Sequence, residues 1–254
     1  MDFVTVDWDF FVPEKAMWDM AHKESEMFLT LLWAHRGGLI KEAVTSGEEK
    51  DFWKSLGKLP KNAFVSDSHA YAYAVTGEAD RVVLFDAHHD CWQKEKDGLV
   101  YCDNWLRVWL EGDESREALW VYPKHVIENW GEQEVPEDLR DRVETLEWNG
   151  SVDLDKVKAV HICRSGCWTP PWLDADFIKF IGHFSRVRSM QDGVWDATKP
   201  RWTDEVFDGV VKSHEQMMAH FKTIQAAQGN QRRIERTVSH NARDHEQVAV
   251  KEGK

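Results

Sequence analysis

The sequence predicts an α/β fold, with a mainly parallel sheet in a three-layer α-β-α arrangement. Short apolar runs of the length of buried strands recur along the chain, and helix-like stretches separate several of them. This alternation favours a parallel sheet that is covered on both faces. The chain has 254 residues, of which 42% are hydrophobic and 30% charged, so it can form a substantial core.

Six strands and six helices are expected. Pro13 suits the first turn of the first helix, Ser68 is a good capping residue for the second, and apolar residues from Phe207 to Ile224 recur at helical spacing in the last. The predicted strands are Phe3–Val6, Ala63–Val65, Val82–Phe85, Ala118–Tyr122, Val143–Trp148 and Ala159–Cys163. The predicted helices are Glu14–Arg36, Ala70–Val75, Asn104–Leu110, Pro136–Val143, Asp174–Phe184 and one that spans Phe207 to Ile224.

No stretch of the chain resembles an interdomain linker. We therefore expect a single domain over residues 1–228, followed by a polar and flexible tail over residues 229–254. The tail has few apolar residues that could anchor it to the domain.

The net charge limits the kinds of partner that we expect, and the cysteine usage indicates a cellular compartment. The formal net charge of −13 argues against nucleic acid or an anionic membrane as the main partner, and it permits a basic substrate. The four cysteines form no Cys-x-x-Cys pair, no apolar run reaches the length of a membrane span, and the N-terminus lacks the features of a signal peptide. We expect a cytoplasmic protein with reduced thiols.

The most informative segment follows the strand Val82–Phe85. Asp86, His88 and Asp90 occupy alternate positions directly after it, so their side chains can converge at the carboxyl end of the strand. Clustered carboxylates repel one another and are costly to bury unless a cation compensates them. Oxygen donors with one imidazole suit Mn²⁺, Zn²⁺ or Fe²⁺ better than Ca²⁺ or Mg²⁺.

Two further strand ends offer similar donors. Asp7 and Asp9 follow the first strand, and His69 follows the second at a strand-to-helix junction. Ligands of open parallel sheets bind outside the carboxyl ends of the strands, so all three ends can face one crevice. The complete set of candidate metal ligands is Asp7, Asp9, His69, Asp86, His88 and Asp90. Four carboxylates and two imidazoles exceed the needs of one ion, so we expect two divalent ions that share carboxylates.

These motifs resemble the arginase and ureohydrolase family. Asp86-Ala87-His88-His89-Asp90 is similar to its Asp-Ala-His-x-Asp motif, which is the specific element of the resemblance. The segments Ser66-Asp67-Ser68-His69-Ala70 and Asp7-Trp8-Asp9-Phe10-Phe11 resemble its metal-binding His segment and its Asp-x-Asp strand end, and residues 160–172 resemble a further strand and pocket loop. More narrowly, the chain is similar to the peptide arginases, which convert arginine within ribosomal peptides to ornithine and release urea.

The resemblance implies a mechanism with two Mn²⁺ ions per chain. One ion binds His69, Asp86, Asp90 and Asp7, and the other binds His88, Asp86, Asp7 and Asp9. Asp86 and Asp7 then bridge the ions, and Asp90 holds the hydroxide that attacks the guanidinium carbon. The implied substrate is peptidyl arginine or a small guanidino compound.

Two departures from the family pattern concern the order of the motifs and the substrate pocket. The Asp-x-Asp strand comes first here and last in arginases, from which we infer a circular permutation. The family's histidine proton shuttle and its guanidinium-binding glutamate have no clear counterparts. Asn104, Arg164 and Ser165 are the candidate substrate-binding residues, although a structural ion pair is an equal alternative for Arg164. His89 is expected to pack or to support its neighbours.

Three other functions remain open. A zinc amidohydrolase or deacetylase of the same fold would keep one metal ion. A haloacid-dehalogenase phosphatase also begins with an Asp-x-Asp strand end, with Asp7 as nucleophile and Asp9 as general acid, but the downstream lysine and acidic motif of that class have no convincing match here. A peptide-binding module without activity is the third alternative, and the presence of all six donors argues against it.

Overall fold

The computed structural model describes residues 1–13, 32–34, 36, 40–93, 98–130, 133–191 and 196–224. Most of the helix expected over Glu14–Arg36 lies outside these ranges, although residues 32–34 and 36 are helical. The expected tail over residues 229–254 also lies outside them. No helix among the described residues combines the length and apolarity that crossing a membrane requires.

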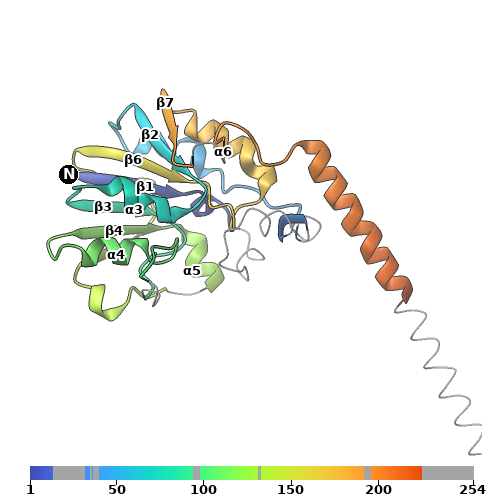
Figure 1. The fold of residues 1–254 in the computed structure, drawn as a ribbon, viewed down its shortest axis with the longest axis horizontal. Coiled ribbons are helices and arrows are strands. Elements are labelled where there is room, and N and C mark those ends of the chain that lie inside the picture. Colours follow the sequence, from blue (N-terminus) through green and yellow to red (C-terminus); the bar gives the residue numbers. More distant parts are fainter. Residues whose placement is uncertain are drawn as a thin grey trace, which may run out of the picture.

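A seven-stranded parallel sheet forms the centre of the molecule, with helices packed against it (Figure 1). This confirms the predicted three-layer α/β fold. The strands are β1 (Asp2–Asp7), β2 (Asn62–Ser66), β3 (Arg81–Phe85), β4 (Glu117–Tyr122), β5 (Val143–Glu147), β6 (Val157–Cys163) and β7 (Arg186–Ser189). Their order in the sheet is β5-β4-β3-β1-β6-β2-β7. All six predicted strands are present, and the first of them lies at the centre.

Two of the predicted helices, Ala70–Val75 and Asp174–Phe184, are shorter in the structure, whereas Asn104–Leu110 keeps its length and is shifted by one residue. The helices are α2 (Phe52–Ser55), α3 (Ala72–Thr76), α4 (Trp105–Glu111), α5 (Lys124–Trp130) and α6 (Asp174–Ile181). Short 3-10 turns accompany them: η1 (Trp8–Phe11), η3 (Glu48–Lys50), η4 (His69–Tyr71), η5 (Glu137–Leu139) and η6 (Pro171–Leu173). Residues 204–224 form the predicted last helix, which projects away from the sheet (Figure 1).

One predicted helix is wrong, and three elements were not predicted: β7, α2 and α5. The segment Pro136–Val143 forms only the turn η5, because Pro136 has an extended backbone and Val143 already pairs with Ala118 as the start of β5. The edge strand β7 escaped prediction because two of its four residues are arginines, which is typical of a protected sheet edge. Helix α5 was also not predicted.

Both faces of the sheet are buried. One face packs against α2 and α6 through an aromatic cluster that includes Trp8, Phe52 and Phe180. The other face packs against α3 and α4, with Trp105 and Trp109 in the core. Strand β1 therefore has buried side chains along its whole length, which include the polar residues Asp2, Thr5 and Asp7. Its central position places its carboxyl end beside those of β3 and β6.

Candidate metal centre

The carboxyl ends of β1, β2 and β3 bring all six predicted donors to one edge of the sheet. Asp7 ends β1 and Asp9 lies in the turn η1 that follows. His69 begins the turn η4 just after β2, and Asp86 directly follows β3. We call Asp7, Asp9, His69, Asp86, His88 and Asp90 the donor cluster.

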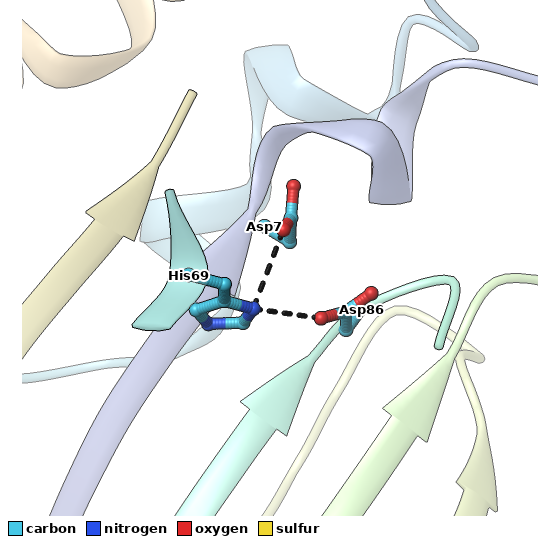
Figure 2. Close-up of side chains that lie close together, drawn as sticks. All are labelled: Asp7, His69 and Asp86. Atoms are coloured by element: carbon cyan, nitrogen blue, oxygen red, sulfur yellow. Dashed lines mark hydrogen bonds and ion pairs between the residues drawn. The ribbon is translucent and has the colours of Figure 1, made fainter. Parts of the chain in front are cut away.

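The first half of the donor cluster surrounds one imidazole nitrogen. His69 Nδ1 lies 2.8 Å from Asp86 Oδ2, 2.9 Å from Asp90 Oδ2 and 3.3 Å from Asp7 Oδ2. Figure 2 shows His69 facing Asp7 and Asp86 across the strand ends. His69, Asp7 and Asp86 each offer one ligand atom, and these atoms lie within 4.8 Å of one another, so the three can hold a metal ion.

The second half is built on His88. Its Nδ1 lies 3.1 Å from Asp9 Oδ2 and 3.3 Å from Asp86 Oδ1. Asp9, Asp86 and His88 form a second group that can hold a metal ion. Asp86 belongs to both groups, with Oδ2 facing His69 and Oδ1 facing His88. One carboxylate therefore connects two candidate ion sites.

Asp9 provides the clearest sign that the donor cluster can hold a cation. Its Oδ2 is buried and accepts no hydrogen bond from the described residues, although His88 Nδ1 is close to it. A buried carboxylate oxygen without a hydrogen bond is costly, and a bound cation removes that cost. The donor cluster as a whole is suited to a divalent ion, because each half combines carboxylate oxygens with one imidazole.

Three carboxyl groups of the cluster, those of Asp9, Asp86 and Asp90, have shifted pKa values without a cation. Burial and the charges of Asp7 and Asp86 raise the pKa of Asp9 to about 8. Burial and the neighbouring Asp86 raise the pKa of Asp90 well above its usual range. Burial alone would raise the pKa of Asp86, but its bonds to His69 and His88 outweigh burial and hold that pKa below its usual range.

The pKa values of the two imidazoles are raised, whereas burial ordinarily lowers the pKa of a histidine. Burial lowers the pKa of His69, yet the hydrogen bonds to Asp7, Asp86 and Asp90 together raise it well above its usual value. His88 behaves in the same way, with burial opposed by Asp9 and Asp86. In the absence of a metal ion, protons therefore take the place of cations in the cluster.

Asp90 is held in an unusual backbone conformation. Its φ angle is 49°, in the left-handed region that residues other than glycine rarely adopt. Its backbone oxygen accepts hydrogen bonds from Leu106 and Arg107, and its Oδ2 accepts one from Trp105 Nε1 at 2.6 Å. These contacts fix the carboxylate against the start of α4 and aim it at His69.

The predicted substrate-binding residues lie outside the donor cluster. Asn104 is buried at the start of α4, where its Oδ1 accepts a hydrogen bond from the Tyr101 amide. Ser165 is buried and has a φ of 56° in the loop after β6. His89 faces away from the cluster and accepts a hydrogen bond from the Cys91 amide, as its expected packing role requires.

Arg164 is a buried member of an ion-pair network. Its Nε donates to Asp67 at 2.7 Å and its Nη1 donates to Asp174 at 3.2 Å. Arg201 also donates to Asp174, at 2.8 Å from Nη2. We call Asp67, Arg164, Asp174 and Arg201 the arginine cluster. These contacts favour the structural interpretation that the sequence left open for Arg164.

Sequence reasoning missed three residues that contact the donor cluster. Trp105 donates to Asp90, Trp168 lies with its ring centroid 4.9 Å from that of His88, and Thr5 Oγ1 lies 2.8 Å from His69 Nε2. It also missed His161, which lies behind Thr5. The available signal was His161 itself, a histidine in the middle of the apolar strand Ala159–Cys163.

Comparisons of this chain with protein-family models, with curated proteins and with solved structures found no match. The geometry of the donor cluster is therefore the basis for any functional proposal.

Proposed function

We propose that this chain is a binuclear manganese hydrolase that cleaves the guanidino group of peptidyl arginine to give ornithine and urea. The observation that carries the proposal is the sharing of Asp86 between two histidine-carboxylate groups. Charge supports a count of two ions. The cluster holds four carboxylates, and its two histidines can supply at most two positive charges. Two divalent ions with neutral imidazoles balance four carboxylates without any protons.

Mn²⁺ is the proposed metal because each half of the cluster is rich in carboxylate oxygen and has one imidazole. Two such ions, when bound, would supply a water molecule of lowered pKa that can be a nucleophile at neutral pH. Asp86 would serve both halves of the cluster. Asp90, held by Trp105, would accept a hydrogen bond from that water and orient it toward the guanidinium carbon.

The choice of a peptide rests on the surroundings of the cluster. A cavity of about 400 Å³ is lined by Ser68 and Ala70, the residues on either side of His69, although none of the six donors is part of its wall. The lining combines polar groups with two partly exposed tyrosines, a mixture that suits a peptide. The lining includes Asp67, Ser68, Tyr71, Tyr73 and Gln191. The acidic net charge of the chain also favours a basic segment around the arginine.

The test is a urea-release assay with Mn²⁺ on arginine, agmatine and an arginine-containing peptide. We expect urea from the peptide in preference to the two small compounds, and none from Asp86→Asn. Asp176→Asn is the matched control, because Asp176 is an exposed carboxylate on α6 that pairs only with Lys179 among the described residues. An absence of urea from all three substrates would overturn the proposal.

Metal content separates this proposal from its alternatives. One zinc ion per chain with no manganese activation would support an amidohydrolase or deacetylase instead. Phosphate release from a phosphomonoester would support a phosphatase in which Asp7 is the nucleophile.

A further inference from the structure

A chain of hydrogen bonds runs from the donor cluster into the core of the sheet. His69 Nε2 lies 2.8 Å from Thr5 Oγ1, which lies 3.0 Å from His161 Nδ1. His161 Nε2 lies 2.9 Å from Ser66 Oγ, and Ser66 Oγ donates to the Ser68 carbonyl at 2.6 Å. All of these side chains are buried. They come from the adjacent strands β1, β6 and β2, and from the turn η4.

The hydrogen bond from Ser66 to the Ser68 carbonyl determines which group is the donor in each of the other bonds. A carbonyl oxygen carries no hydrogen, so Ser66 must use its single hydroxyl proton to bond Ser68. Ser66 Oγ is then an acceptor toward His161, whose Nε2 must carry a proton. The two ring nitrogens of His161 face the hydroxyl groups of Thr5 and Ser66 and no carboxylate, and the ring is completely buried, so His161 is neutral. A neutral His161 with a proton on Nε2 has an acceptor at Nδ1.

The same reasoning assigns the position of the proton on His69. Thr5 donates its hydroxyl proton to His161 Nδ1, so its oxygen can only accept from His69. His69 therefore carries a proton on Nε2. Once His69 loses its second proton, the lone pair is on Nδ1, the atom that faces Asp7, Asp86 and Asp90.

We infer that Thr5, His161 and Ser66 are positioning residues, which hold His69 in the one tautomer that presents Nδ1 to a metal ion. This inference rests on the metal centre proposed above and extends it into the core. It gives His161 a role that packing alone does not explain, because an apolar side chain would fill the strand centre without needing hydrogen-bond partners for two ring nitrogens.

The first experiment reads the tautomers directly. Two-dimensional NMR of protein labelled with ¹⁵N-histidine distinguishes a proton on Nε2 from one on Nδ1. We expect the Nε2–H form for His161 in the metal-free protein, and for His69 in protein loaded with Zn²⁺ as a diamagnetic probe. Finding His161 protonated on Nδ1 would overturn the inference, whether or not the protein hydrolyses arginine.

The second experiment compares Thr5→Val with Thr5→Ser. Valine keeps the shape of threonine but cannot accept the proton of His69, whereas serine keeps the hydroxyl. We expect Thr5→Val to weaken binding of the Mn²⁺ ion at the His69 half of the cluster by about 10- to 100-fold. Thr5→Ser should retain most of the affinity. Ser66→Ala is expected to allow His161 to shift its proton to Nδ1 in the same NMR spectra.

The outcomes separate the two proposals. If the wild-type protein binds Mn²⁺ but Thr5→Val, folded by circular dichroism, binds it equally well, the positioning role is wrong and the metal centre stands. If wild-type protein binds no divalent ion, the metal centre is wrong, and the NMR result on His161 still decides the direction of the hydrogen bonds.

Discussion

Two buried groups of acids occupy the same edge of the sheet and are neutralised in different ways. In the arginine cluster, Asp67 and Asp174 are matched by Arg164 and Arg201, so two negative charges meet two positive ones. In the donor cluster, four carboxylates have imidazoles, an indole and backbone amides as their recorded partners. The first cluster is complete within the protein, whereas the second is completed by protons or by metal ions. The comparison shows that a buried acid indicates a ligand only when the chain supplies no permanent cation for it.

Replacing the shared carboxylate should have the largest effect. We expect Asp86→Asn to lower urea release by at least about 10⁴-fold, because both ion sites lose a ligand. Metal analysis should find fewer than two manganese ions per chain in this variant. The corresponding change in the arginine cluster, Asp67→Asn, should leave the metal content unchanged. Equal metal content in wild type and Asp86→Asn would contradict the assignment of Asp86.

Breaking the arginine cluster should instead cost stability. Asp174 is almost completely buried and accepts hydrogen bonds from two arginine side chains. Asp174→Asn leaves both guanidinium groups without their shared partner, so we expect a loss of about 3 to 5 kcal/mol in the free energy of unfolding. Urea denaturation measures it, with Asp176→Asn as the exposed control that should change stability by less than about 0.5 kcal/mol. A loss no larger than that of the control would show that the ion pairs contribute little.

In metal-free protein, Asp9→Asn is expected to raise the free energy of unfolding, whereas Asp174→Asn lowers it. Its pKa rises from 3.8 to about 8 on folding, so the folded state binds this proton more tightly than the unfolded state. Its contribution to stability is present below pH 3.8 and is lost as the pH rises through 8. Because asparagine resembles the protonated acid, the stability of Asp9→Asn relative to wild type should be higher at pH 8.5 than at pH 5, by up to about 1.4 kcal/mol for each pH unit below 8.

Denaturation in EDTA at these two pH values tests the prediction for Asp9. Added Mn²⁺ should reverse the order, because wild type then gains the binding energy that the variant has lost. A variant that is less stable than wild type at pH 8.5 in EDTA would show that Asp9 is satisfied without a metal.

The smallest effect is expected at Trp105. Trp105→Phe keeps most of the ring packing near His69 but removes the hydrogen bond to Asp90 Oδ2. We expect kcat to fall by about tenfold and stability to fall by about 1 kcal/mol. Steady-state kinetics at saturating Mn²⁺ measures the first change. An unchanged kcat would mean that the backbone at Asp90 positions its carboxylate without help from the indole.

The sequence was most informative where side chains follow a strand. The donors Asp7, Asp86 and His88 could be predicted because the carboxyl ends of parallel strands meet at one edge, and alternation puts every second residue on the same side. His161 and Thr5 could not be assigned. Their contact depends on β6 lying beside β1, and the order of strands in a sheet is not encoded by any local pattern.

Arg164 illustrates a second limit of prediction from sequence. An arginine after a strand is compatible with substrate binding and with an ion pair, and only the positions of Asp67 and Asp174 distinguish these roles. Asp174 follows Arg164 by ten residues, with an intervening loop whose path is set by tertiary contacts such as those of Thr169. The same holds for Trp105, whose indole reaches Asp90 through the local fold of residues 98–104.

The central place of β1 has a consequence for the order of folding. Strand β2, which precedes His69, does not pair with β1 directly, because β6 lies between them and begins only at Val157. Contacts between such distant segments of a chain slow folding. An ion that needs donors from the ends of both β1 and β2 can therefore bind only after β6 has joined the sheet.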